Sequence, residues 1–379
     1  MIFNSDITFS NEAKQVQETS YKFLERSSWN RCKLARILIS MWMKDLTDDL
    51  EFISQIRSKS DKQHDAAIFE LIVYTFLSKQ GLTVDKHPIL SKATTPDFTA
   101  KSDTVALMLL ECTLSSNSFD STEEERRKEA VEDIIRQIHY YPYFINLGFK
   151  RISKISVTPK KLKRFIEQIR ISSEGFENEQ LFHRKFLYKE NEWEIEISLL
   201  KKSNNGIKTS LGAVFQDAKI IDSKKAILTA LNDKRPSKYG ISDTPYVICI
   251  CVNDMFFHTD EMYSVLFGND YGTHINLTFP GSSGFLYHNK PVNTSVSAVI
   301  LFKNTDILTL GSAEWSVWHN PFAKNPLELK SLPIDEYHFT IEGNRLLKRV
   351  INKNANVFEL LHVDELAYNT DPKGTDESC

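Results

Sequence analysis

The sequence predicts an α/β fold in which a mixed β-sheet is flanked by helices. Helical patterns alternate with strand-like runs along much of the chain. The segment from Asp65 to Gln80 is apolar on almost every side, which indicates a helix buried within the protein. The run from Pro245 to Val252 is apolar throughout, as in strands that are covered on both faces. These features favour a central sheet between layers of helix.

The first 60 residues are expected to form a helical N-terminal region. Apolar side chains return near every 3.6 positions from Asn11 to about Arg57. The next helix, Asp65 to Gln80, is followed by Gly81, and glycine is the usual residue just beyond a helix C-terminus. This second helix should therefore lead directly from the helical region into the core.

Three short strands are predicted after that helix. They are expected at about Thr83 to His87, Asp97 to Ala100 and Thr104 to Thr113. The connection Lys101–Asp103 is short enough for a hairpin between the second and third strands.

The remaining chain is expected to continue this core and to enlarge it. A helix from Asp222 to about Arg235 precedes the apolar strand, which gives a core over residues 61–260 with an insertion at about 116–220. A β-rich C-terminal extension is predicted at 261–370, followed by a disordered polar tail at 371–379. Within the extension, we expect a strand at 295–302 and a loop at 315–327, with His319 in a turn packed by Trp315 and Trp318.

Composition excludes several classes of protein. The 379 residues contain no apolar run of the roughly 20 residues that span a bilayer, so no membrane contact and a cytoplasmic location are expected. The five cysteines show no Cys-x-x-Cys spacing and therefore indicate neither a cysteine zinc site nor a disulfide framework. No Gly-x-x-x-x-Gly-Lys phosphate loop occurs, so an ATPase is not expected.

Positive charge is concentrated in the middle of the chain. The net charge is −3, but residues 150–238 carry 20 Lys and Arg against 11 Asp and Glu, which gives 20 − 11 = +9. Such a segment can follow a phosphate backbone, although solvated lysines on helices and loops explain it equally well.

Three acidic residues occupy positions that are suited to binding a divalent metal. Glu70 lies within the apolar helix, Asp97 begins a strand in Thr95-Pro96-Asp97-Phe98, and Glu111 lies near the end of the next strand. Carboxylates on neighbouring strands can share one Mg²⁺, which neutralises charge during phosphodiester hydrolysis. Without a cation, carboxylates so close together would repel one another and at least one pKa would rise.

These residues resemble the active-site core of the PD-(D/E)XK (restriction-endonuclease-like) nuclease superfamily. The similarity lies in Phe69-Glu70-Leu71, Gly81 to Val84, His87-Pro88, Pro96-Asp97-Phe98 and Leu110-Glu111-Cys112-Thr113, and it covers about residues 65–115. The resemblance implies a bacterial-type member with a restriction-endonuclease-like mixed sheet. It also implies that Glu70, Asp97 and Glu111 bind Mg²⁺, with Mn²⁺ as a substitute.

The chain departs from that family at Thr113, where a lysine that orients the attacking water usually stands. A threonine hydroxyl can form a hydrogen bond to water or phosphate but supplies no positive charge. If Ala226, Ile227, Ala230 and Leu231 form the buried stripe of the helix from Asp222, Lys234 lies one turn beyond Ala230 on the same side. We therefore expect Lys234, or Lys238 after the break at Pro236, to supply the missing ammonium, unless these are ordinary lysines near a helix C-terminus.

A rival assignment uses a different helix and strand. It makes Ser121 to Tyr140 the core helix and Tyr143 to Phe149 the strand that follows. Gln137 and Tyr141 would then resemble the Gln-x-x-x-Tyr element of exonuclease-type members, with Lys128 as a nearby cation.

The expected function is metal-dependent cleavage of nucleic acid, DNA in preference to RNA. Members of the superfamily serve restriction, phage defence or repair, so a second copy of the chain or a partner protein of a defence system are further expected partners. Two alternatives stay open because of Thr113. One is a catalytically inactive module that binds nucleic acid or protein, and the other is a nuclease subunit that cuts only with a partner.

Overall fold

In the computed structural model the chain forms two compact units. The first unit combines Met1–Ser116 with Asp222–Cys379, and the second is Asn117–Ile221. The residues that the structure describes are 2–4, 6–12, 14, 18–88, 95–102, 105–115, 121–138, 143–176, 184–202, 210–215, 223–234, 243–254, 257–268, 274–276, 284–287, 290–327, 332–342, 345–353 and 355–363.

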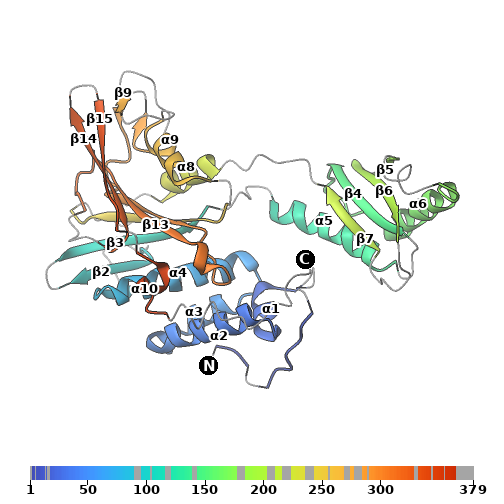
Figure 1. Ribbon diagram of the computed structural model, residues 1–379, viewed down its shortest axis with the longest axis horizontal. Coiled ribbons are helices and arrows are strands. Elements are labelled where there is room, and N and C mark those ends of the chain that lie inside the picture. The colour runs from blue at the N-terminus through green and yellow to red at the C-terminus, as the bar shows by residue number, and fades with distance from the viewer. Residues whose placement is uncertain are drawn as a thin grey trace. The chain divides into compact units, whose positions relative to one another are not determined.

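A nine-stranded mixed sheet forms the centre of the first unit (Figure 1). The order of the strands across this sheet is β1-β2-β3-β8-β12-β13-β14-β15-β9. Their bounds are β1 Thr83–Lys86, β2 Phe98–Ser102, β3 Val105–Leu114, β8 Tyr246–Val252, β12 Ala298–Lys303, β13 Glu314–His319, β14 Asp335–Glu342, β15 Arg345–Ile351 and β9 His274–Asn276.

The three central strands, β3, β8 and β12, run parallel to one another. β1, β2 and β3 are joined as antiparallel neighbours on one side, and β13 pairs antiparallel with β12 on the other. The expected mixed sheet with flanking helices is therefore confirmed. Because β3 pairs directly with β8, residues that are 130 or more positions apart in the sequence meet at the centre of the sheet.

Helices from the N-terminal region cover one face of the sheet. They are α1 Ser20–Arg26, α2 Asn30–Trp42, η1 Met43–Leu46, α3 Leu50–Ile56 and α4 Asp61–Lys79. Helix α4 is the most deeply buried, since Phe69 and Phe76 pack edge-on against Phe302 of β12. Gly81 follows α4 with a φ of 77°, in the left-handed conformation that ends a helix.

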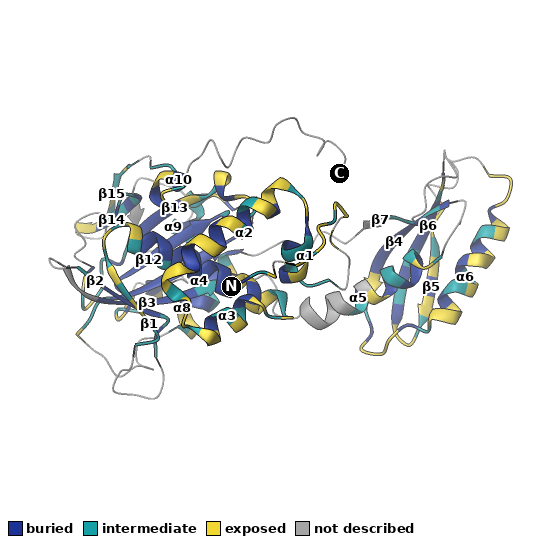
Figure 2. Cartoon of the chain, turned by 90° about the horizontal axis from the view of Figure 1, so that it is seen from below, coloured by how far each residue is buried: buried dark blue, intermediate teal, exposed yellow. Residues whose placement is uncertain are grey.

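The opposite face of the sheet is covered by α8 (Ser223–Asp233) and α9 (Met262–Phe267). The seven residues of strand β8 are all buried, which shows that both faces of the sheet are covered. Its neighbour β12 is likewise buried along its length (Figure 2). Val247, Cys249 and Cys251 face the core beneath the N-terminal helices, whereas the alternate residues face α8 and α9. The continuous apolar run in the sequence therefore reflects a strand between two hydrophobic cores.

The remaining elements of the first unit are short. They are η3 Thr259–Glu261, β10 Leu286–Tyr287, β11 Lys290–Pro291, η4 Leu310–Ser312 and α10 Val357–Leu360. Among the described helices of the whole chain, none combines the length and the apolar character needed to cross a membrane.

The second unit is a smaller α/β layer. A four-stranded sheet, in the order β5-β6-β4-β7, packs against α5 Ser121–Arg136 and α6 Pro159–Ser172. The strands are β4 Tyr143–Arg151, β5 Phe186–Glu190, β6 Trp193–Lys201 and β7 Leu211–Phe215. The β5–β6 hairpin turns at Asn191 and Glu192, which both have positive φ, as a two-residue hairpin requires.

One sequence-based expectation about this fold is wrong, and others lie outside the described residues. The predicted loop at 315–327 is wrong in its first part, because residues up to His319 form β13 between β12 and β14. The segment predicted as a β-rich C-terminal extension, 261–370, contributes β12 to β15 to the central sheet. The tail at 371–379, Lys238 and Tyr141 lie outside the described residues.

Candidate active site

Asp97 and Glu111 come together because β2 and β3 form an antiparallel pair. Asp97 immediately precedes β2, and Phe98 lies opposite Leu110. The Asp97 Oδ2 atom accepts a hydrogen bond of 2.6 Å from the backbone N–H of Cys112. This bond links the start of β2 to the part of β3 that carries Glu111.

Lys234 reaches the same place from a distant part of the chain. Ile227, Ala230 and Leu231 form the buried side of α8, and the Lys234 N–H donates to the Ala230 carbonyl at 3.0 Å. The Lys234 Nζ then donates to Glu111 Oε1 at 2.6 Å. Because the Glu111 side chain is only 6% exposed, this ion pair is largely shielded from solvent.

Glu70 lies on α4 among buried neighbours, including Phe69 and Leu71. Its Oε2 atom is buried and has no hydrogen-bond partner among the described residues. An ionised carboxylate with such an oxygen is costly, so the site favours either a proton or a cation at Glu70.

The pKa values of Glu70 and Asp97 respond to burial and to the charges of neighbouring acidic residues. Burial raises the pKa of Glu70 to about 7, and the negative charge of Asp97 adds to this effect. Burial and the charge of Glu111 likewise raise the pKa of Asp97 to about 6, against the opposing effect of the Cys112 N–H. Burial alone would lower the pKa of Lys234, but the Glu111 carboxylate outweighs it and the pKa is raised.

Thr113 lies two residues beyond Glu111 on the same strand. Side chains alternate along β3, so Thr113 is on the face of the sheet that also carries Glu111, and it is half-buried. Its hydroxyl is thus placed on the side from which Lys234 approaches.

Lys86 is a residue of this region that sequence reasoning missed. It lies at the end of β1, opposite Phe98, and its charge lowers the pKa of both Glu70 and Asp97. Its ammonium bonds to Asp49 Oδ2 at 3.1 Å and lies 3.8 Å from the centre of the Phe52 ring. One feature of the sequence could have indicated this, because Lys86 directly precedes His87-Pro88 at the end of the strand predicted just before the hairpin.

The rival helix and strand do not join this site through the sheet. β4 pairs with β6 and β7 in the four-stranded sheet, whereas β8 is the parallel neighbour of β3. Lys128 and Gln137 belong to the second unit. The strand beside β3 in the central sheet is therefore β8, and the helix that precedes β8 in the chain is α8.

The three carboxylates are chemically suited to a hard divalent cation, although the group of described residues whose ligand atoms lie within 4.8 Å of one another is a different one, on β13 and β14. Glu70, Asp97 and Glu111 offer carboxylate oxygens, the ligands that Mg²⁺ prefers in proteins. Lys234 and Lys86 lower the pKa values of Glu70 and Asp97, and the Cys112 N–H also lowers that of Asp97. Burial, which is the largest effect, and repulsion between the carboxylates outweigh them. A bound cation would remove this repulsion.

No protein-family model, curated protein sequence or solved structure matches the chain. The central feature of the site is the convergence of three carboxylates and one ammonium from α4, the β2–β3 pair and the end of α8.

We expect Glu70→Gln to stabilise the metal-free protein at pH 8. The pKa of Glu70 rises from 4.5 to about 7, so the folded state loses stability as pH increases between these values. At about 1.36 kcal/mol per pKa unit, the variant should gain about 1–3 kcal/mol at pH 8 and little below pH 4.5. Urea unfolding in EDTA at several pH values measures the difference.

Glu51→Gln, an exposed carboxylate on α3, is the matched control and should change little at either pH. Adding Mg²⁺ at pH 8 should stabilise the parent protein more than Glu70→Gln, because the variant lacks one charged oxygen ligand. A Glu70→Gln protein that is less stable than the parent at pH 8 would contradict the electrostatic interpretation of Glu70.

Proposed function

We propose that the first unit is a metal-dependent nuclease of the PD-(D/E)XK type that hydrolyses phosphodiester bonds. The observation that carries this proposal is the 2.6 Å contact between Lys234 and Glu111, whose positions are 123 residues apart. Through this contact Lys234 places an ammonium beside Glu111, and Thr113, which stands where the resembling family usually has lysine, provides none. The parallel β3–β8 pair, with α8 before β8, also supports this fold type.

Each side chain has a chemical role under this proposal. Glu70, Asp97 and Glu111 hold the cation, and Mg²⁺ bound there supplies positive charge against the negative charge that develops on the phosphate. Lys234 remains protonated near neutral pH and stabilises that charge or orients the attacking water. The Thr113 hydroxyl is suited to a hydrogen bond with the same water or with a phosphate oxygen.

Basic residues of the second unit are the proposed contact with the nucleic-acid backbone. Lys154, Lys160 and Arg164 are exposed at or near the start of α6. Other lysines of this unit are already paired, since Lys161 lies 2.9 Å from Glu190 and Lys185 lies 2.7 Å from Glu196. The positively charged surface is therefore smaller than the number of lysines and arginines in this segment suggests. The proposed substrate is DNA in preference to RNA.

A cleavage assay tests the proposal directly. We expect the purified full chain to cut at least one of supercoiled DNA, linear DNA, single-stranded DNA or RNA with Mg²⁺ or Mn²⁺, and to be inactive in EDTA. Loss of the activity in Glu111→Gln would assign it to this site and exclude a contaminating nuclease.

The same assay separates the alternatives. Binding of nucleic acid without cleavage of any substrate would favour the inactive binding module. Cleavage that appears only after a partner protein is added would favour the partner-dependent subunit. Cleavage that persists unchanged in Glu111→Gln would reject the proposed site.

A further inference from the structure

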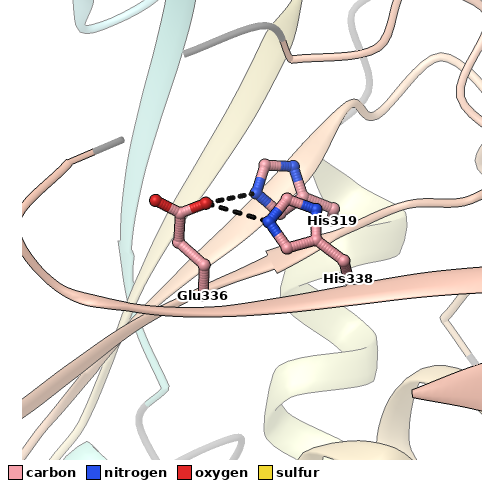
Figure 3. Close-up of side chains that lie close together, drawn as sticks. All are labelled: His319, Glu336 and His338. Carbon is pink, nitrogen blue, oxygen red and sulfur yellow. Dashed lines mark hydrogen bonds and ion pairs between the residues drawn. The ribbon is translucent and has the colours of Figure 1, made fainter. Parts of the chain in front are cut away.

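A second group of potential metal ligands lies on β13 and β14 (Figure 3). His319 is the last residue of β13, and Glu336 and His338 are two positions apart on β14, so both point to the same face of the sheet. The parallel register pairs Val317 with Glu336 and Trp318 with Tyr337, which brings His319 beside His338. One ligand atom from each side chain lies within 4.8 Å of the other two.

The distances show convergence on one carboxylate oxygen. Glu336 Oε2 lies 2.9 Å from His338 Nε2 and 3.6 Å from His319 Nε2. The two imidazole rings are stacked, with centroids 4.1 Å apart and an interplanar angle of 12°. The ligand atoms of the three side chains therefore already lie close enough together to surround one ion after a small rearrangement.

Two atoms of this group are buried without a hydrogen-bond partner among the described residues. They are Glu336 Oε1 and His319 Nε2. Glu336 is only 6% exposed, so its carboxylate has lost most of its hydration without full compensation by the protein. Such unsatisfied atoms are expected where a bound ion completes the site.

We propose that His319, Glu336 and His338 bind a transition-metal dication, with Zn²⁺ as the ion of choice. Two imidazole nitrogens and one carboxylate oxygen form a common zinc ligand set, which leaves a fourth position for water or another ligand. Mg²⁺ prefers oxygen ligands, so this site and the carboxylate site near Glu111 should select different metals.

The orientation of the two imidazole rings requires a small rearrangement when an ion binds. Because a ring nitrogen's lone pair lies in the plane of the ring, one of the two stacked rings must turn on binding. His338, whose side chain is 36% exposed, has the room to turn.

This site is separate from the carboxylate site. β8 and β12 lie between β3 and β13 in the sheet order, which corresponds to about three strand spacings, or about 14 Å. A bound ion would join β13 to β14, whose parallel register covers only three residue pairs. We therefore infer that the metal fastens the outer strands β14 and β15 to the centre of the sheet.

The test measures zinc binding by the full chain with the carboxylate site disabled. The parent for this experiment is Asp97→Asn combined with Glu111→Gln, stripped with a chelator and dialysed against Zn²⁺, with bound metal measured by mass spectrometry. We expect one Zn²⁺ per chain, an affinity unchanged by excess Mg²⁺, and a higher melting temperature with Zn²⁺. His319→Gln and His338→Gln should each weaken binding at least tenfold and remove the rise in melting temperature.

His258→Gln, an exposed histidine elsewhere in the first unit, is the matched control and should bind as the parent does. If the more buried His319→Gln fails to fold, as judged by circular dichroism, the partly exposed His338→Gln decides the outcome. Binding of no Zn²⁺ by the parent, or equal affinity in the parent and His338→Gln, would overturn the proposal. Equal loss in His258→Gln would also overturn it, because zinc would then bind surface histidines without selection.

Discussion

Asp97→Asn is expected to reduce the rate of nucleic-acid cleavage about 10³-fold while leaving the protein folded. The substitution keeps the shape of the side chain and an oxygen that can accept the Cys112 N–H bond. It removes the negative charge through which Asp97 would hold Mg²⁺, and a loss of about 4 kcal/mol in stabilisation of the transition state corresponds to this factor.

The expected stability of Asp97→Asn means that a loss of cleavage in this variant would not result from unfolding. Because the pKa of Asp97 is raised to about 6, its ionisation lowers the stability of the folded protein relative to the unfolded chain at pH 8. The variant should therefore be at least as stable as the parent in EDTA, which thermal unfolding at pH 8 measures. Asp85→Asn, an exposed carboxylate on β1, is the matched control and should cleave at the parental rate. Parental cleavage by Asp97→Asn would refute the assignment of Asp97.

Lys234→Met is expected to reduce the cleavage rate by about 10²–10³-fold, the range typical for removing one group that stabilises transition-state charge. Methionine retains much of the apolar stem but lacks the ammonium that lies 2.6 Å from Glu111. Lys234→Arg should retain part of the activity because it keeps the positive charge. Lys225→Met, an exposed lysine on the same helix, is the control that should remain active.

A compensating substitution gives a sharper test of the Lys234 role. Adding Thr113→Lys to Lys234→Met moves the ammonium to the strand position where the resembling family carries it. We expect this double variant to recover about tenfold or more of the lost rate, since each tenfold step requires only about 1.4 kcal/mol. Single-turnover cleavage at saturating Mg²⁺ separates this effect from metal binding. Full activity of Lys234→Met without the second change would show that Lys234 is only a structural partner of Glu111.

Local sequence patterns predicted the inner elements of the first unit well. The apolar run from Pro245 to Val252 corresponds to β8, and the predicted helix from Asp65 to Gln80 corresponds to α4 with an earlier start at Asp61. Both segments are buried on several sides, so their composition carries a strong signal. The proposed helix stripe also placed Lys234 on the side of α8 from which it contacts Glu111, although a catalytic role of Lys234 remains a prediction.

The errors occurred where local and tertiary signals disagree. The segment from Trp315 to His319 was expected to be a loop because Asn and Pro follow it closely, yet it forms β13. Pairing with β12 and β14 and the packing of Trp318 against Tyr337 decide this conformation. His319 was accordingly expected in a turn, and its proximity to His338 could not be read from residues that are 19 positions apart.

The sequence by itself determined the residue types of the candidate site and the main buried elements, because burial and charge leave local patterns in composition. It contains Glu70, Asp97 and Glu111 in the order found in the resembling family, and it has Thr113 at the position where that family usually has lysine. Only the tertiary structure decided which distant side chains meet, since strand order places β8 beside β3 and β14 beside β13. That order reflects the burial of both faces of the sheet, a property of the whole chain that no single segment encodes.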